Sequence, residues 1–385
     1  MILIGDVREK LATLPSDSVH CCVTSPPYFR LRDYGCEGQI GLEKTPEEFI
    51  ANLVDVFREV KRVLHPSGVC FVNIGDSYNG IGGPGKQDCG PIGATAATAI
   101  KGTQGRSVLG LKAKDLCLIP WRLVLALQMD GWYVRDIIVW HKPAPMPESV
   151  TDRCTKAWEP IFMLAKSEKY FWDQEAVSEV AQTSGKPMNF TTQQADGIGC
   201  SPSGNQLPEN YSKPRGTSRN PRNVWKIAQT PFAEAHFACF PEGLPERCIK
   251  AGTSEKGCCP KCLSPWRRVT EKTKLKRERP NDYTKRTGED GTGNHCANTV
   301  AGVSVETLGW EPTCSCDAGE PIPCTVLDCF GGSGTTGRMA RLLGRKYILC
   351  ELNPEYAAMA ERRINAPLEK VQTFKSLPNQ RELFS

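Results

Sequence analysis

Apolar and polar residues alternate along the chain in two patterns, short apolar runs and longer stretches with helical spacing. Residues 19–23 (VHCCV) and 69–76 (VCFVNIGD) are largely apolar, as expected of strands that are covered on both faces. Between them, residues 45–48 (TPEE) offer an N-cap, a first-turn proline and a capping-box glutamate, and apolar residues from Phe49 to Leu64 recur at helical spacing. The order strand, helix, strand predicts an α/β fold.

The same rhythm continues on both sides of these elements. Residues 1–18 predict a short strand and a short helix, residues 116–143 a helix followed by a strand, and residues 158–172 one further strand. The helix after residue 45 is expected to stop at the turn 65–68 (HPSG), because proline does not continue a helix. A mostly parallel sheet follows from this alternation.

Three irregular stretches interrupt the pattern. Residues 77–114 are rich in Gly, Ala and Thr, residues 173–230 are rich in polar residues, Gly and Pro, and residues 257–320 have cysteines at both ends and a charged middle. Loops of this length are usually functional or disordered. We therefore expect one catalytic fold with insertions.

Composition narrows the setting of the protein. Of its 385 residues, 39% are hydrophobic and 24% charged, and the net charge of +5 permits a polyanionic partner without requiring one. No apolar stretch reaches the ~18 residues that span a bilayer, and no signal-peptide pattern is present. We expect a cytoplasmic protein, in which the 19 cysteines serve as metal ligands or small core residues rather than as disulfides.

Residues 325–356 hold the most informative pattern. A strand leads into the glycine turn 330–334 (FGGSG), a helix follows from Thr335, and a second strand ends on Glu351. Such a unit presents backbone amides to an anionic group and an acidic side chain to ribose hydroxyls. The full G-x-G-x-x-G spacing and a P-loop lysine are missing, which disfavours a dinucleotide or a nucleoside triphosphate. An ordinary glycine turn in an α/β core is the alternative.

A second distinctive stretch, residues 23–29 (VTSPPYF), directly follows an apolar strand. Its two prolines predict a stiff, extended loop that leaves carbonyl oxygens without local partners and holds the ring of Tyr28 away from the sheet. Ligands of parallel sheets gather at the carboxyl ends of the strands. If the strands that end at Val23 and Asp328 are neighbours, the loop therefore faces the glycine turn, which predicts a cofactor placed against a flat polar substrate.

The segments TSPPY (24–28) and FGGSGTT (330–336) together resemble the amino-methylating DNA methyltransferases, which transfer a methyl group from S-adenosylmethionine to the exocyclic nitrogen of cytosine or adenine. The order of the two segments is similar to that of the permuted (beta) group. Further segments that resemble the family are IGDVREKLATLPSDSVHCCVTSPPY, GWYVRDIIVWHKPAPMPES, RNVWKI and HFACFPEGLPERCIKAGT. The resemblance implies a doubly wound, mostly parallel, seven-stranded-type sheet with target-recognition and Cys-rich insertions.

The resemblance also implies roles for individual residues. The Ser25 hydroxyl and the Pro26 carbonyl would hold the exocyclic amine, and Tyr28 would stack on a base that has left the duplex. The implied catalytic set is Ser25, Pro26, Pro27 and Tyr28. The implied cofactor-binding set is Asp6, Asp328, Phe330, Gly331, Gly332, Ser333, Gly334, Thr335, Thr336, Glu351 and Asn353. A turn-forming aspartate explains Asp6 equally well.

The resemblance further implies a domain layout and partners. The expected parts are a catalytic half (1–172, with the irregular insertion 77–114), a candidate target-recognition region (173–230), a cofactor-binding half (231–256 and 321–368), a Cys-rich insertion (257–320) and a tail (369–385). Arg215, Arg219 and Arg222 are candidates for contacts with phosphates or guanine edges. Double-stranded DNA is the expected partner, membranes are not, and a homodimer and a cognate restriction enzyme stay open. A bacterial or phage-encoded protein is expected.

Two pairs of cysteines flank the third irregular stretch. Cys259, Cys262, Cys314 and Cys316 would supply four thiolates to one tetrahedral zinc ion. The long gap between the pairs leaves chance pairing as an alternative, and Cys258 competes with Cys259 as a ligand. Residues 267–287 are strongly basic and predict either a solvated loop or a phosphate-contacting arm. We expect a zinc-stabilised module beside the DNA path.

Several functions compete with DNA amino-methylation. A serine at position 25 is typical of N4-cytosine members of the family, so cytosine N4 is favoured over adenine N6. An enzyme that methylates RNA or a protein amide is a more remote alternative, and a DNA-binding protein with a dead site is disfavoured by the intact loops. A cytosine C5 enzyme is disfavoured because the substrate loop has no cysteine nucleophile.

Overall fold

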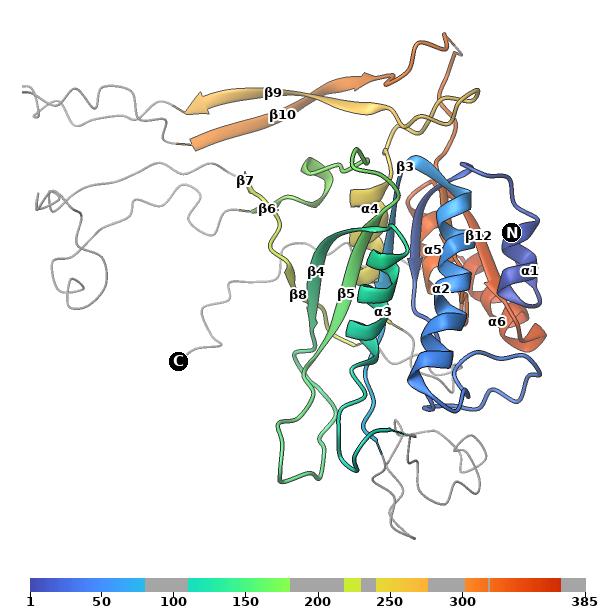
Figure 1. The fold of residues 1–385 in the computed structure, drawn as a ribbon. Helices are drawn as coiled ribbons and strands as arrows, with labels where there is room; N and C mark the ends of the chain where they lie inside the picture. The colour runs from blue at the N-terminus through green and yellow to red at the C-terminus, as the bar shows by residue number, and fades with distance from the viewer. Residues whose placement is uncertain (80–109, 181–217, 230–239, 276–301, 318, 368–385) are drawn as a thin grey trace, which may run out of the picture.

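A computed structural model describes residues 1–79, 110–180, 218–229, 240–275, 302–317 and 319–367. At its centre lies an eight-stranded sheet in the order β1-β12-β11-β2-β3-β5-β4-β8 (Figure 1). The strands are β1 (Ile2–Ile4), β2 (Val19–Thr24), β3 (Leu64–Asn73), β4 (Tyr133–His141), β5 (Trp158–Ala165), β8 (Val224–Lys226), β11 (Thr325–Asp328) and β12 (Lys346–Glu351). Only β5 runs antiparallel to its neighbours, so the predicted α/β class with a mostly parallel sheet is confirmed.

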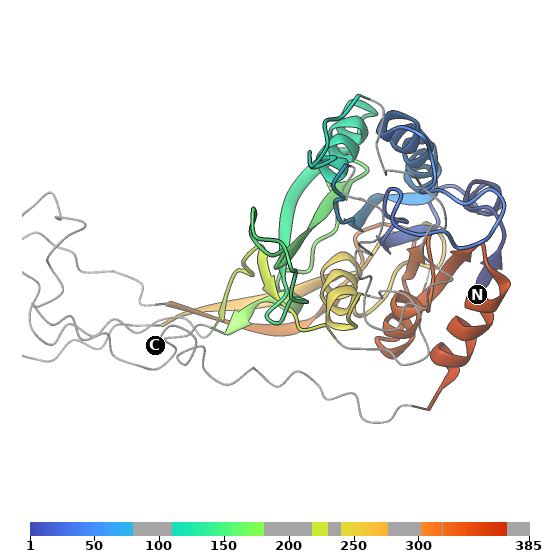
Figure 2. The same ribbon diagram turned by 90° about the horizontal axis from the view of Figure 1, so that it is seen from below.

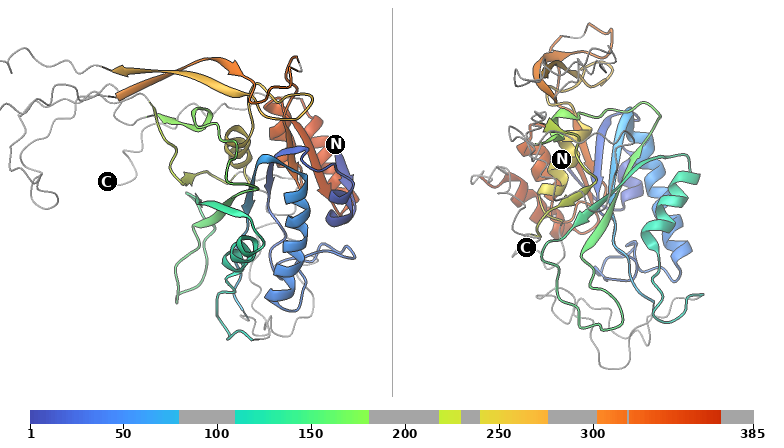
Figure 3. Two further views of the ribbon diagram at one scale, coloured as in Figure 1. Left: turned by 45° about the horizontal axis from the view of Figure 1, so that its top comes forward. Right: turned by 90° about the vertical axis from the view of Figure 1, so that its left-hand side faces the viewer.

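Helices cover both faces of the sheet, which makes the fold doubly wound (Figure 3). One face carries α1 (Val7–Ala12), α2 (Pro46–Val63) and α3 (Ile119–Met129); the other carries α4 (Gly243–Gly252), α5 (Thr335–Leu342) and α6 (Pro354–Asn365). Adjacent strand residues serve opposite faces: Cys22 packs with α2 and α3, whereas Cys21 packs with α4. This is the pattern that a strand buried on both faces requires. No helix in the described ranges is long and apolar enough to cross a bilayer.

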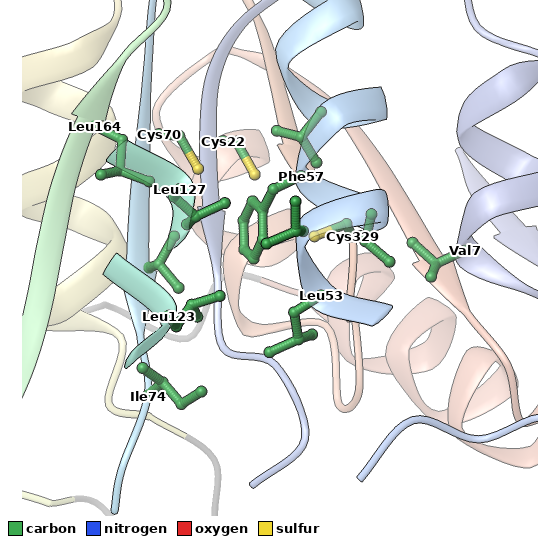
Figure 4. Close-up of a cluster of buried hydrophobic side chains, with 14 of the residues drawn as sticks. Val7, Cys22, Leu53, Phe57, Cys70, Ile74, Leu123, Leu127, Leu164 and Cys329 are labelled. Carbon is green, nitrogen blue, oxygen red and sulfur yellow. The ribbon is translucent and has the colours of Figure 1, made fainter. Parts of the chain in front are cut away.

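Helix α2 forms as its sequence predicts. The Thr45 side chain caps it by accepting a hydrogen bond from the Glu48 amide at 3.2 Å. Most of its apolar side chains are buried, and Leu53 and Phe57 are fully buried in the core cluster that includes residues of β2 and β3 (Figure 4). Strand β3, by contrast, begins at Leu64 and includes the predicted turn 65–68. A residue before proline favours extended backbone, and here that backbone pairs: the Ser67 carbonyl accepts from the Phe171 amide at 2.8 Å.

Two smaller pairs of strands lie outside the central sheet. β9 (Arg267–Leu275) and β10 (Gly302–Glu311) form an antiparallel ribbon that projects from the body (Figures 1 and 2). β6 (Glu179–Val180) pairs with β7 (Ser218–Arg219) after a short 3-10 helix, Glu175–Val177. Residues 224–226, inside the candidate target-recognition region, are the β8 edge strand of the central sheet.

Candidate functional site

A cavity with a volume of ≈ 250 Å³ opens at the carboxyl edge of the sheet. Strand β2 lies next to β11, with Cys22 opposite Leu327, so the loops that follow these two strands emerge side by side. Residues 25–28 and the glycine turn both line the cavity. The predicted meeting of these two loops, which are some 300 residues apart in sequence, is confirmed.

Asp328 lies at the centre of the cofactor side, at the end of β11. Its carboxylate is 1% exposed and accepts hydrogen bonds from Thr24 Oγ1 at 2.7 Å and Thr336 Oγ1 at 2.8 Å. The Phe330 amide donates a third bond at 3.1 Å. Burial raises the pKa of Asp328 to about 7, because the charged form loses its hydration. A cationic ligand in the cavity would restore the charged carboxylate.

Glu351 closes the glycine turn from the end of β12. Its carboxylate accepts hydrogen bonds from the Gly332 amide at 2.7 Å and the Asn353 amide at 2.9 Å. Burial raises the pKa of this carboxyl group above its usual value. Gly334 has φ +77°, and a Cβ there would lie 2.8 Å from the Ala360 Cβ, so only glycine lets the turn pack on α6.

The predicted cofactor residues contribute in different ways. Most line the cavity: Asp6, Asp328, Phe330, Gly331, Gly332, Ser333, Thr335, Glu351 and Asn353. Gly334 and Thr336 do not line it; Gly334 shapes the turn and Thr336 holds Asp328. Asn353 also caps α6 by accepting from the Glu355 amide at 2.8 Å.

Asp6 fits both roles that the sequence left open, the turn-forming aspartate and the residue of the cofactor site. It caps α1 by accepting from the Arg8 amide at 2.8 Å and pairs with the Arg8 guanidinium. The hydrogen bond from Arg8 lowers the pKa of Asp6. Asp6 nevertheless lines the cavity together with Gly5, so a cap at the sheet edge also forms part of the wall.

The loop 25–28 forms the opposite wall of the cavity. The Tyr28 hydroxyl donates to Glu159 Oε2 at 2.8 Å. The ring lies against the backbone after β3, where a Cβ on Gly75 would lie 2.4 Å from Tyr28 Cε2. Asn73, at the end of β3, also reaches Glu159. A planar group that enters here meets the aromatic ring of Tyr28, the Ser25 hydroxyl and the two prolines of the loop.

Some lining residues were missed by the sequence analysis. On the side of the loop 25–28 these are Asn73, Trp140, Lys142 and Glu159; around the cofactor side they include Tyr34, Gln39, Tyr356 and Met359. Phe240, which belongs to the family-like segment HFACFP, also lines the cavity. Glu159 belongs to β5, and Lys142 directly follows β4, the antiparallel neighbour of β5. The sequence signal for Glu159 was a charged residue at the start of the otherwise apolar strand β5. That start lies at the carboxyl edge of the sheet only because β5 is antiparallel to its neighbours, which the sequence did not show.

The four predicted metal ligands come together. The sulfur atoms of Cys259, Cys262, Cys314 and Cys316 all lie within 4.8 Å of one another. The turn 259–264 is closed by backbone bonds, from the Cys259 amide to the Ser264 carbonyl at 2.9 Å and from the Leu263 amide to the Cys259 carbonyl at 2.9 Å. Four thiolates at this separation suit a tetrahedral zinc ion.

Cys258, the competing ligand, belongs to another cluster with His20 and Cys324. His20 Nδ1 accepts from the Thr325 amide at 3.0 Å, and its Nε2 donates to the Leu263 carbonyl at 2.8 Å. Both ring nitrogens are therefore occupied, and a histidine in this state is not a metal ligand. His20 instead ties the cysteine turn to the sheet.

The cysteine module lies at the amino edge of the sheet. His20 stands at the start of β2 and Cys324 directly precedes β11, whereas residues 25–28 follow the other end of β2. A six-residue strand separates the two edges by about 20 Å. The module is thus on the side of the sheet opposite to the loop 25–28, rather than beside it.

The ribbon β9–β10 is anchored at its base. The Arg268 guanidinium pairs with Asp173 at 2.9 Å and with Glu255 at 2.7 Å, and it lies 4.3 Å from the centre of the Trp310 ring. Arg267 pairs with Glu311. These two cations of the basic run 267–287 are therefore neutralised by acids, and residues 276–301 lie outside the described residues.

The arginines expected to reach DNA are partly placed. Arg219 and Arg222 both pair with Glu179, at 2.9 Å and 3.2 Å. Arg215 lies outside the described residues, as do residues 236–239 of the family-like segment HFACFP. The two described arginines thus close the β6–β7 pair in this structure.

The sheet, the glycine turn and the Pro-Pro loop define a methyltransferase architecture, and the comparisons with known proteins agree. A sequence model of the DNA methylase family matches residues 19–259 and 324–362. The chain is 37% identical to the type II methyltransferase M.Cfr9I of Citrobacter freundii and 38% identical to M.XycI of Xanthomonas campestris pv. cyanopsidis; each match covers 94% of this chain and 86% of the relative. Among solved structures, a PvuII DNA methyltransferase described as cytosine-N4-specific shares the fold with a TM-score of 0.51 and 18% identity, over 96% of this chain and 88% of that one.

This chain belongs to the DNA methylase family. It is an S-adenosylmethionine-dependent DNA methyltransferase of the group that methylates the exocyclic nitrogen of cytosine or adenine, and DNA is its substrate.

Proposed function

We propose that the protein methylates the N4 nitrogen of cytosine at a specific DNA sequence. The observation that carries this proposal is Ser25, a neutral hydroxyl at the first position of the Pro-Pro-Tyr loop, which lines the cavity next to Tyr28. Serine at this position is typical of the N4-cytosine members of the family, whereas aspartate is more usual among the adenine enzymes. Adenine N6 is the second candidate.

The donor set of the cavity fits S-adenosylmethionine. Two carboxylates, the fully buried Asp328 and the half-buried Glu351, face a cavity that is also lined by the glycine turn. A ligand with a cationic amine and ribose hydroxyls satisfies both: Asp328 is placed to hold the ammonium of the methionine part and Glu351 the ribose hydroxyls. Bound S-adenosylmethionine would supply a methyl group attached to a sulfonium sulfur. Once the methyl group is transferred, the rest of the cofactor is a neutral thioether and is the leaving group.

The residues of the loop 25–28 activate the acceptor. The lone pair of an exocyclic amine is delocalised into the base ring, so the amine is a poor nucleophile. Hydrogen bonds from its two N–H groups to the Ser25 hydroxyl and the Pro26 carbonyl hold the nitrogen in line with the methyl group and favour its pyramidal form. Tyr28 stacks on the base that has left the duplex. The proton that the nitrogen loses after methyl transfer passes to solvent at the cavity mouth.

Analysis of nucleosides tests the choice of base. Duplex DNA incubated with the protein and S-adenosylmethionine is digested to nucleosides and examined by mass spectrometry. We expect N4-methylcytosine. N6-methyladenine instead would show that adenine N6, the second candidate, is the target. Detection of 5-methylcytosine would contradict the role given to Ser25.

We also propose that Cys259, Cys262, Cys314 and Cys316 hold one structural zinc ion. The mutual distances of the four sulfur atoms support this proposal. Zinc would link the turn 259–264 to residues 314–316 and so join the two ends of the ribbon β9–β10.

Within residues 173–230, we propose that the target sequence is recognised by the chain between β6 and β7. Residues 224–226 are excluded because they form β8 of the central sheet. Because the similar relatives are named type II methyltransferases, we further propose that a restriction enzyme with the same target accompanies this protein.

A further inference from the structure

Three polar side chains, Asn73, Lys142 and Glu159, lie beside the loop 25–28 and have no role in the chemistry above. Glu159 Oε2 accepts hydrogen bonds from the Tyr28 hydroxyl at 2.8 Å and from Asn73 Nδ2 at 3.2 Å. Its other oxygen forms an ion pair with Lys142. All four side chains line the cavity.

The environment of Glu159 limits what it can do. The side chains of Lys142 and Glu159 are only 14% and 17% exposed. Three donors converge on the carboxylate, which is therefore an ionised acceptor whose charge is balanced by the ammonium of Lys142. A carboxylate occupied in this way is poorly suited to take a proton from the substrate. Its contacts indicate that it holds neighbouring groups in place.

The group that Glu159 holds is the ring of Tyr28. Gly75 lets the ring lie directly against the backbone that follows β3, since a Cβ at Gly75 would come within 2.4 Å of Tyr28 Cε2 and 3.0 Å of Cδ2. The ring is thus fixed at its edge by Gly75 and at its hydroxyl by Glu159. Asn73 in turn donates to the Pro160 carbonyl at 3.2 Å, which ties Glu159 to the adjoining ends of β3 and β5.

We propose that Glu159 is the positioning residue of the base-binding loop: through the Tyr28 hydroxyl it fixes the ring on which the flipped base stacks, while Asn73 and Lys142 hold Glu159. Small displacements of a stacking platform move the amine out of line with the methyl group and slow the transfer step. Because Tyr28 contacts the base only in the proposed function, the role of Glu159 rests on that function as well.

A double-mutant cycle tests this role, with Tyr28→Phe, Glu159→Gln and the double variant. Tyr28→Phe removes only the hydroxyl, and a glutamine at 159 has one acceptor oxygen in place of the two separate oxygens that Tyr28 and Lys142 use. Each single change should lower kcat for duplex DNA about tenfold, the loss expected for one hydrogen bond. Calorimetry should find the Kd for S-adenosylmethionine within about twofold of wild type, since both changes lie on the base side.

The double variant is decisive. If Glu159 acts through the hydroxyl, Glu159→Gln should lower kcat by no more than about twofold once Tyr28 is phenylalanine. Independent effects that multiply to about a hundredfold would overturn the proposal, because Glu159 would then act on the substrate or the fold directly. Wild-type kcat in either single variant would overturn it too.

A matched control excludes a general effect of breaking a Lys–Glu pair. Glu246→Gln removes the pair with Lys250 on α4, which does not line the cavity, and should leave kcat unchanged. If the wild-type protein methylates no DNA, the proposed function is refuted. If the wild type is active but the effects of Tyr28→Phe and Glu159→Gln on kcat multiply in the double variant, only the role of Glu159 is refuted.

Discussion

Two side chains on opposite walls of the cavity govern its two ligands. Tyr28 and Asp328 both line the cavity, and in the proposed function Tyr28 stacks on the base while the buried Asp328 carboxylate binds the cofactor. They belong to loops at the ends of adjacent strands, and Thr24, at the end of β2, donates directly to Asp328. Substitution of either residue should affect one ligand and spare the other.

Tyr28→Ala should nearly abolish turnover while S-adenosylmethionine binds as in wild type. The stacking surface is lost, and the glycine turn and Asp328 are untouched; a stacked base is worth about 1–3 kcal/mol. Methylation of duplex DNA and calorimetry with the cofactor measure the two effects. Wild-type turnover in this variant would remove the loop 25–28 from the site.

The affinity for S-adenosylmethionine should fall as the pH is lowered from 8 to 6. Burial raises the pKa of Asp328 to about 7, so in acid the carboxyl group is neutral and no longer attracts the ammonium of the cofactor. Asp328→Asn should weaken binding at pH 8 and flatten the pH dependence. Asp152→Asn, at an exposed pair with Lys114, should leave the profile unchanged. Affinity that does not vary with pH in wild type would contradict this role.

The stability of the free protein should show the opposite trend. The folded protein binds a proton at Asp328 between the ordinary pKa of 3.8 and about 7, whereas the unfolded chain does not. The stability contributed by this group is therefore present in acid and lost as the pH rises through about 7.

At the scale of elements, the ribbon β9–β10 depends on a buried ion pair at its base. Asp173 is 3% exposed in its pair with Arg268, and the removal of one partner from a buried pair costs about 3–5 kcal/mol. Arg268→Ala should therefore lower the melting temperature clearly. Arg267→Ala removes the exposed pair with Glu311 and should cost at most about 1 kcal/mol. Equal melting temperatures for the two variants would mean that the ribbon is not anchored by Arg268.

The cysteine cluster should bind about one zinc ion per chain. Cys262→Ser should reduce the metal content and increase proteolysis at the base of the ribbon, while cofactor affinity stays normal, because the cluster lies at the edge of the sheet opposite to the cavity. Cys154→Ser changes an exposed cysteine outside the cluster and should keep the metal. Elemental analysis and limited proteolysis provide the measurements. Purified protein that is folded, active and free of zinc would contradict the zinc site and would mean that these cysteines are ordinary packing residues.

Local sequence was sufficient for some elements and not for others. The capping residues and apolar spacing of α2, the glycine turn and the strand before residues 25–28 are encoded locally, and all were predictable. Strand β8, the pairing of residues 64–68 and the role of Glu159 depend on neighbours distant in sequence. Cys258 and Cys259 look equivalent in the sequence, and only the position of His20 separates them.

At the scale of the whole molecule, the target sequence should be separable from the chemistry. Residues 181–217 lie outside the described residues, and the strands that flank them in sequence, β6 and β7, pair at Glu179 and Arg219. Exchange of this segment for that of a relative with another target should change the sequence that is methylated and leave cofactor affinity intact. An unchanged target, read by sequencing that detects methylated bases, would place recognition in another part of the chain.

The topology of the sheet also sets the order in which the protein matures during synthesis. Ile2 pairs with Leu349 and Cys21 with Val326. Strand β1 and one edge of β2 therefore stay unpaired until the ribosome has synthesised β11 and β12. At about 5–20 residues per second this wait lasts about 20–70 s. During that interval an unpaired strand edge is open to wrong partners. A chain that stops before β11 contains residues 25–28 without the glycine turn 330–334, and therefore lacks one wall of the cavity.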